Sequence, residues 1–118
     1  MSRLSDFIKG IPLRFWPLMF WLVWCIATTF MVLPGEDLPP VQLWDKAEHA
    51  MTFFVLMTIA WLAYRRHCPT LRLAILLVIY GFAIECIQYF IPSRSFSLED
   101  VLADGVGVLP AFWIAVRL

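Results

Sequence analysis

Residues 80–107 read YGFAIECIQYFIPSRSFSLEDVLADGVG, and they introduce polar and ionisable side chains into segments that are otherwise apolar. Glu85 lies inside the apolar run that ends at Pro92, and Gln88 follows at a spacing that places both residues on one face of a helix. Asp100 and Asp104 then open the next apolar run. Because an ionisable group is costly to place inside a membrane segment, each of these residues is a candidate for function.

The composition of the whole chain indicates a membrane environment. Of its 118 residues, 62% are hydrophobic and 15% are charged, whereas a typical soluble domain has about 45–50% apolar and about 25% charged residues. The length fits a single domain that covers residues 1–118. The formal net charge is zero and the basic residues are not interleaved with aromatic ones, which argues against nucleic acid as a partner.

Four apolar runs are each long enough to cross a hydrocarbon core of about 30 Å as a helix. Their predicted bounds are residues 13–33, 45–64, 73–91 and 98–116. Ser97 followed by Asp100 is a helix N-capping pattern and marks the start of the fourth run. The first run is long for a cleaved signal peptide, and no clear small-residue cleavage site follows it. We therefore predict an all-α polytopic membrane protein, a bundle of four transmembrane helices.

The basic residues predict the orientation, since Lys and Arg accumulate in cytoplasmic loops. Most of them lie before the first run, between the second and third runs, or after the fourth run: Arg3, Lys9, Arg14, Arg65, Arg66, Arg72 and Arg117. Lys46 and Arg94 lie on the opposite side. This distribution predicts that both termini are cytoplasmic and that the protein crosses the cytoplasmic (inner) membrane several times.

Polar residues from three of the predicted helices are expected to meet near the non-cytoplasmic side. Glu85 and Asp104 each lie seven residues from the helix ends marked by Pro92 and Ser97, which is about 10 Å along a helix axis. His49, about one turn into the second run, could donate a hydrogen bond to Glu85. We predict an outward-facing polar pocket lined by Asp45, Lys46, His49, Glu85, Gln88, Arg94, Asp100 and Asp104.

Small residues occur on the same predicted helix faces. Gly81 precedes Glu85 by one turn, and Gly107 and Ala111 follow Asp104 by one and two turns. Small side chains let helix backbones approach each other closely in membranes. We therefore expect these faces to pack together.

At these residues the chain resembles the VanZ-like family of small integral membrane proteins. The sequence departs from the family pattern at Asp104, where the family has an asparagine, and this adds a carboxyl group to the predicted pocket. The resemblance implies a multi-helix envelope protein of a family named for an accessory protein that gives low-level resistance to the glycopeptide teicoplanin. The matching features are, in chain order, Asp45-Lys46 followed by His49, Glu85 with Gln88, Phe90-Ile91-Pro92 then Arg94, and Asp100 with Gly107.

The first functional hypothesis is a non-enzymatic envelope protein whose pocket binds a polar lipid headgroup or a cell-wall or glycopeptide-related ligand. Lys46 and Arg94 would meet an anionic group of this ligand, because both lie on the outer side against the positive-inside bias. The expected partners are membrane lipids and such a lipid-linked or glycopeptide ligand, and a homo-oligomer is left open.

Other functions stay open as alternatives. In a membrane-embedded hydrolase or transferase, His49 and Glu85 would act as acid and base, but no nucleophile stands out and we assign no catalytic residue. In a proton-coupled transporter Glu85 would carry the proton, although four helices are few for alternating access. In a purely structural cluster the polar residues would only hold the helices together. A metal held by His49, Glu85 and Asp104 has suitable ligand types but no signature spacing, so we predict no metal and no cofactor.

Overall fold

The computed structural model describes residues 2–12, 14–32, 45–91 and 98–117, with the backbone alone for a few residues that include Asp45 and Lys46. Within these residues the chain is helical and contains no strand, which confirms the all-α prediction. The helices are α1 (Ser2–Lys9), α2 (Phe15–Val32), α3 (Asp45–Tyr64), α4 (Thr70–Tyr89) and α5 (Leu98–Ala115).

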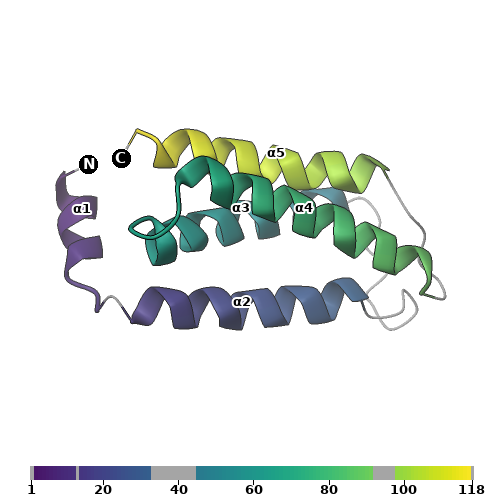
Figure 1. The fold of residues 1–118 in the computed structure, drawn as a ribbon, viewed down its shortest axis with the longest axis horizontal. Coiled ribbons are helices and arrows are strands. Elements are labelled where there is room, and N and C mark those ends of the chain that lie inside the picture. Colours follow the sequence, from purple (N-terminus) through teal and green to yellow (C-terminus); the bar gives the residue numbers. More distant parts are fainter. Residues whose placement is uncertain (1, 13, 33–44, 92–97, 118) are drawn as a thin grey trace.

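The four long helices lie side by side, and the short helix α1 lies across one end of them (Figure 1). Helix α3 packs against α2, α4 and α5, and its contact with α5 is the most extensive in the molecule. The two ends of the chain lie at the end of the molecule that carries α1 (Figure 1). The order of helices therefore places the start of α3, the end of α4 and the start of α5 together at the opposite end.

Three of the helices are long and apolar enough to cross a membrane. They are Phe15–Val32, Ala47–Tyr64 and Thr70–Tyr89. Helix α5 also has 18 residues, but Glu99, Asp100 and Asp104 in its first half give it more charged residues than any of these three spans. The predicted fourth transmembrane segment therefore corresponds to a helix of suitable length whose crossing of the membrane stays a prediction.

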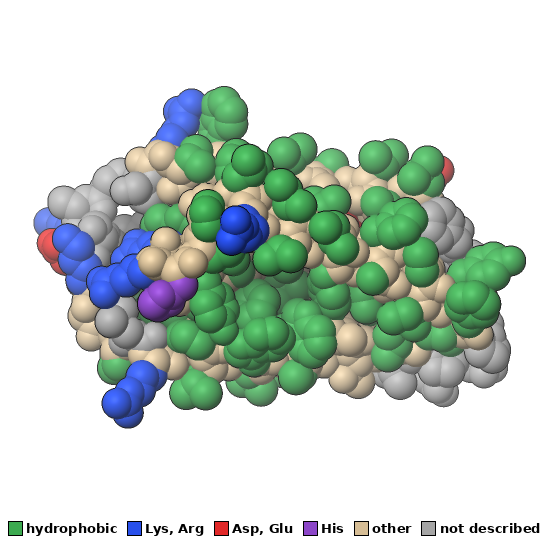
Figure 2. Space-filling view, in the orientation of Figure 1, with side chains coloured by type: hydrophobic (Ala, Val, Ile, Leu, Met, Phe, Trp, Pro, Cys, Tyr) green, Lys and Arg blue, Asp and Glu red, His purple; other side chains and the backbone are tan. Residues whose placement is uncertain are grey.

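The outer surfaces of the helices are apolar. Leu18, Leu22 and Ile26 of α2 are exposed at spacings of four residues, and Leu109 and Trp113 of α5 are exposed in the same way. Hydrophobic side chains cover most of the visible face, and Lys and Arg side chains gather at the end near α1 (Figure 2). Large exposed apolar surfaces of this kind are expected where a protein contacts lipid or a partner.

An aromatic layer joins α2, α3 and α4 in the interior. The ring of Tyr80 lies 5.7 Å from the ring of Trp24 and 5.7 Å from the ring of Phe53. The Tyr80 hydroxyl also forms a hydrogen bond with the Thr28 hydroxyl. Because Trp24 and Thr28 belong to α2, Tyr80 connects this helix to the core by both a ring contact and a hydrogen bond.

Two buried glycines allow close approaches between helices. A β-carbon at Gly107 would overlap the carbonyl group of Ala50 on α3, and a β-carbon at Gly81 would lie 2.6 Å from Oδ2 of Asp104 and 3.2 Å from Cζ of Phe53. Neither position has room for a side chain as the neighbours now lie. These two contacts bring α3 and α4 against the first half of α5, where the acidic residues are.

Candidate functional site

Four ionisable side chains from three helices are buried at the end of the molecule opposite α1. We call them the polar cluster: His49 of α3, Glu85 of α4, and Asp100 and Asp104 of α5. Their exposed fractions are 5% for His49, 0% for Glu85, 8% for Asp100 and 2% for Asp104. Asp and Glu are almost never fully buried unless they have partners, so the common location of three such carboxyl groups with His49 is the most informative feature of the structure.

The helical repeat explains why each helix directs its polar residues inward. On α4 the buried positions include Leu77, Gly81 and Glu85, each one turn after the last. On α5 the buried positions include Asp100 and Asp104, followed by apolar or small residues further along the same face. The polar cluster is therefore the continuation of the apolar core toward one end of the helices.

His49 lies between the two aspartates of α5. Its Nδ1 lies 2.8 Å from Oδ1 of Asp104, within hydrogen-bonding distance. Its Nε2 lies 4.0 Å from Oδ2 of Asp100, which is beyond the usual length of about 2.7–3.2 Å for such a bond. An ionised carboxylate only accepts hydrogen bonds, so in the form with Asp104 ionised Nδ1 of His49 is the donor. The hydrogen bond fixes the orientation of the ring and directs Nε2 toward Asp100.

Glu85 completes a group of possible metal ligands. One nitrogen of His49 and one carboxylate oxygen each from Glu85 and Asp100 all lie within 4.8 Å of one another. The sequence suggested Asp104 as the third member of such a group, beside His49 and Glu85. In the structure Asp100 has this place, and Asp104 contacts the other side of the imidazole.

Gln88 makes a different kind of contact from the one we expected of a pocket residue. It is 1% exposed, and its Nε2 donates a hydrogen bond of 2.6 Å to the main-chain carbonyl of Met31. Met31 lies in the last turn of α2, where carbonyl groups have no partner within the helix. Gln88 therefore caps α2 from α4 and joins these two helices.

The remaining residues of the predicted pocket are not placed. The backbone of Asp45 and Lys46 begins α3, but their side chains and the whole of Arg94 lie outside the described residues. The expectation that Lys46 and Arg94 meet an anionic ligand stays a prediction.

Sequence reasoning did not include Phe53 in the site. Phe53 follows His49 by one turn, is fully buried, and lies at the contact between Gly81 and Asp104. Phe53 therefore lies between the polar cluster and the apolar core. The four-residue spacing from His49 is the signal that could have identified it.

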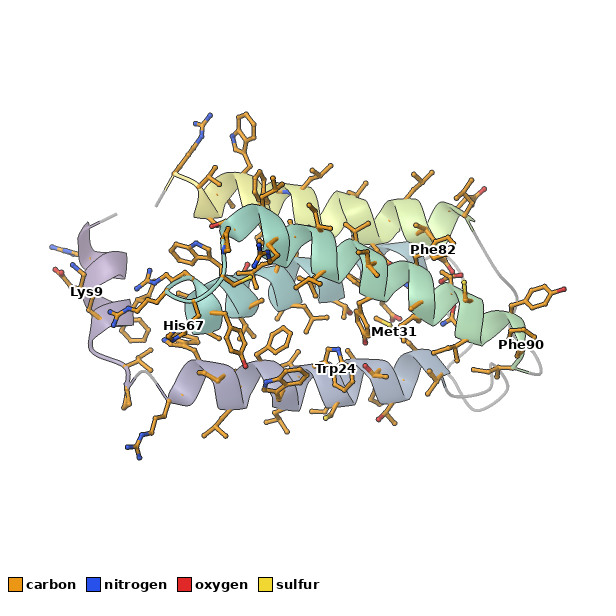
Figure 3. The ribbon with its side chains drawn as sticks, in the orientation of Figure 1. Lys9, Trp24, Met31, His67, Phe82 and Phe90 are labelled. Atoms are coloured by element: carbon orange, nitrogen blue, oxygen red, sulfur yellow. The ribbon has the colours of Figure 1, made fainter. Side chains whose placement is uncertain are left out.

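The polar cluster and the described basic side chains lie at opposite ends of the helices. Lys9 and His67 lie at the end near α1, whereas Phe90, just after α4, lies at the far end (Figure 3). His49 is in the first turns of α3, and Glu85 is near the end of α4. The structure thus reproduces the separation of basic and polar ends that the sequence predicted.

Comparison with known proteins identifies the family of the chain. A family model described as VanZ/LLP1 matches residues 3–118. The chain belongs to the VanZ/LLP1 family. The match confirms the resemblance noted between residues 45 and 107 and extends it over nearly the whole VanZ/LLP1 chain. With its three apolar helices, this VanZ/LLP1 protein is a membrane protein. Neither the curated proteins nor the solved structures gave a match.

Proposed function

We propose that this VanZ/LLP1 protein is a multi-pass protein of the cytoplasmic membrane with four spans, α2 to α5, and both termini in the cytoplasm. Three of these helices have the length and apolar character of spans, and α5 lies beside them with a similar length. The exposed basic residues at the α1 end include Arg65, Arg66 and Arg117, and a basic end of this kind favours the cytoplasmic side. The polar cluster then lies near the non-cytoplasmic surface.

We further propose that the polar cluster is the binding site for a polar group of a membrane lipid or of a cell-wall or glycopeptide-related molecule. The observation that carries this proposal is the burial of His49, Glu85, Asp100 and Asp104 in one place. An ionised group near the bilayer centre costs about 2.5–3.5 kcal/mol. The hydrogen bond between His49 and Asp104 alone would join α3 to α5. Glu85 and Asp100 place two further buried carboxyl groups beside this pair, and such a concentration of polar groups inside an apolar bundle supports a ligand-binding role.

A hydrolase or transferase is the second candidate, and one observation favours it. An imidazole that is oriented by a carboxylate on one nitrogen is the arrangement of a general base. His49 and Asp104 have this arrangement. The serines of the predicted turn at residues 92–97 lie outside the described residues, so no nucleophile is assigned and we favour binding over catalysis.

Native mass spectrometry of the protein in a mild detergent tests the binding proposal. The wild type is compared with Glu85→Gln, which replaces a fully buried carboxyl group by an amide of the same size, and with Glu48→Gln, the same change at an exposed position of α3. We expect the wild type and Glu48→Gln to retain the same lipid or lipid-linked molecule and Glu85→Gln to lose it. Identical bound masses in all three proteins would refute a ligand role for the polar cluster.

A further inference from the structure

We propose that His49, Glu85 and Asp100 bind a divalent first-row transition-metal ion, such as Zn²⁺ or Mn²⁺, and that Asp104 positions His49 for this role. The inference rests on the proposed function, because it names the cofactor of the same binding site. It departs from our sequence-based expectation of no metal. The metal assignment is based on the arrangement of four side chains that come from three different helices.

The distances within the group suit the ligands of one ion. Two ligand atoms that are each about 2.0–2.2 Å from a Zn²⁺ ion lie at most about 4.4 Å apart. Nε2 of His49 and Oδ2 of Asp100 are 4.0 Å apart. One ring nitrogen of His49 and one carboxylate oxygen each from Glu85 and Asp100 lie within 4.8 Å of one another, so side-chain rotations that move an atom by less than about 1 Å bring the set into range. The separation between His49 and Asp100 fits two ligands better than it fits a hydrogen bond.

Asp104 supplies the second part of the argument. A histidine that binds a metal through one nitrogen usually donates its other N–H to a carboxylate or a carbonyl, which fixes the ring and makes it a better ligand. Nδ1 of His49 and Oδ1 of Asp104 form this contact at 2.8 Å. The ring edge that carries Nε2 is thereby directed to the side where Asp100 lies. An acidic cluster alone would not provide an oriented imidazole.

The helix packing holds this arrangement in place. Gly107 packs against the main chain of Ala50, which directly follows His49, and Gly81 leaves the space that the Asp104 carboxylate occupies. Both contacts would be lost with a larger residue. Metal sites need ligands whose positions are fixed by the surrounding structure, and here two glycines fix α3 and α4 relative to α5.

The donor types indicate the class of metal. An imidazole suits Zn, Fe, Ni and Cu, whereas carboxylates also suit Mn, Mg and Ca, so a mixed set favours a transition metal over Mg²⁺ and Ca²⁺. Cys86 adjoins Glu85 but is exposed, so it adds no thiolate to the buried group. Three protein ligands leave at least one coordination position for water or for an oxygen of a bound headgroup.

The test measures metal binding by the full-length protein without a polyhistidine tag. The protein is stripped with a chelator in mild detergent and dialysed separately against Zn²⁺, Mn²⁺ and, as a spectroscopic probe, Co²⁺. Elemental analysis then gives the ions bound per chain, and titration gives the Kd. The variants are His49→Gln, Glu85→Gln, Asp100→Asn and Asp104→Asn. Glu48→Gln and His67→Gln are the controls, because both positions are exposed and lie outside the polar cluster.

We expect about one ion per chain in the wild type and in both controls, with visible Co²⁺ absorption bands typical of nitrogen and oxygen ligands. Changing a ligand should abolish binding. Asp104→Asn should keep the ion but raise the Kd by about 10- to 100-fold, as expected for a residue that acts through the histidine. If a variant does not fold, the wild-type Co²⁺ spectrum still distinguishes a metal site from a purely structural cluster, because a structural cluster gives no such bands.

Two results would overturn the inference. If the wild type binds no stoichiometric metal but retains a lipid that Glu85→Gln loses, the metal assignment fails and the proposed function stands. If the wild type binds neither a metal nor a lipid, both proposals fail. Metal binding that is lost in His67→Gln and kept in His49→Gln would place the ion outside the polar cluster and also refute the inference.

Discussion

Gly107 of α5 lies against the main-chain carbonyl of Ala50 on α3, so close that a β-carbon at position 107 would come within 2.8 Å of the carbonyl carbon. This contact determines the geometry of the polar cluster. Ala50 directly follows His49, and Gly107 lies one turn after Asp104. The same approach of two helices therefore brings Nδ1 of His49 to 2.8 Å from Oδ1 of Asp104.

Gly107→Ala should destabilise the protein. The new methyl group would meet main-chain atoms of α3, which cannot rotate away as a side chain could. Overpacking of this kind typically costs about 1–3 kcal/mol. The free energy of unfolding in mixed detergent micelles, followed by circular dichroism, measures the effect.

Gly105→Ala is the matched control for this prediction. It lies two residues away on α5, and a β-carbon there would meet no atom within 4 Å. Because Ala is a better helix former than Gly by about 1 kcal/mol, this variant should be as stable as the wild type or slightly more so. Equal losses of stability in the two variants would show that α3 and α5 do not approach closely at Ala50.

Gly81→Ala should affect the polar cluster more than the fold. A β-carbon at position 81 would lie 2.6 Å from Oδ2 of Asp104. This neighbour is the end of a flexible side chain and can move, at the expense of its hydrogen bond with His49. We expect weaker ligand retention in native mass spectrometry, with a fall in Tm smaller than that of Gly107→Ala. Unchanged retention would mean that Asp104 does not need its present position.

Gln88→Leu should weaken the contact between α2 and α4 without preventing the protein from binding its ligand. The substitution takes away the donor that lies 2.6 Å from the Met31 carbonyl, and a buried carbonyl without its partner costs about 1–3 kcal/mol. Met31→Leu keeps the main-chain carbonyl and should reduce the stability less than Gln88→Leu does. Thermal unfolding and native mass spectrometry of both variants separate the roles. Loss of ligand at unchanged stability would instead make Gln88 a ligand-binding residue.

Tyr80→Phe should also weaken the contact between α2 and α4. It removes the hydroxyl that is hydrogen-bonded to Thr28 while keeping the ring that contacts Trp24. The expected loss in free energy of unfolding is about 1 kcal/mol. Tyr89→Phe is the control, because Tyr89 is 66% exposed and should change nothing. A double-mutant cycle with Thr28→Val should show coupling between positions 28 and 80.

The proposed topology predicts which positions a membrane-impermeant maleimide can reach in intact cells. In a background where Cys25, Cys68 and Cys86 are changed to serine, a single cysteine is placed at Glu36 or at His67. Glu36→Cys should react from outside, and His67→Cys should react only after the cells are permeabilised. Both must react in detergent as a control. The reverse pattern would invert the orientation and place the polar cluster near the cytoplasm.

The helices themselves could be predicted with good accuracy from the sequence. The second predicted run, residues 45–64, has the bounds of α3, and the other three runs end within three residues of α2, α4 and α5. Long apolar runs with few charges, ended by proline or polar turns, determine such helices locally. Helix α1 was not predicted, because its eight residues contain charges and no apolar run. The buried faces of α4 and α5 also followed from the helical repeat.

The sequence by itself thus determined which residues share a helix face, and only the tertiary structure decided which faces and atoms meet. The structure pairs His49 with Asp104 and Gln88 with the carbonyl of Met31, two specific partners that the sequence did not indicate. One residue corresponds to a rotation of about 100° and a rise of about 1.5 Å along a helix, so small shifts between helices exchange these partners. The shifts are set by contacts between segments far apart in the chain, such as Gly107 with Ala50, and periodicity within one helix carries no information about them.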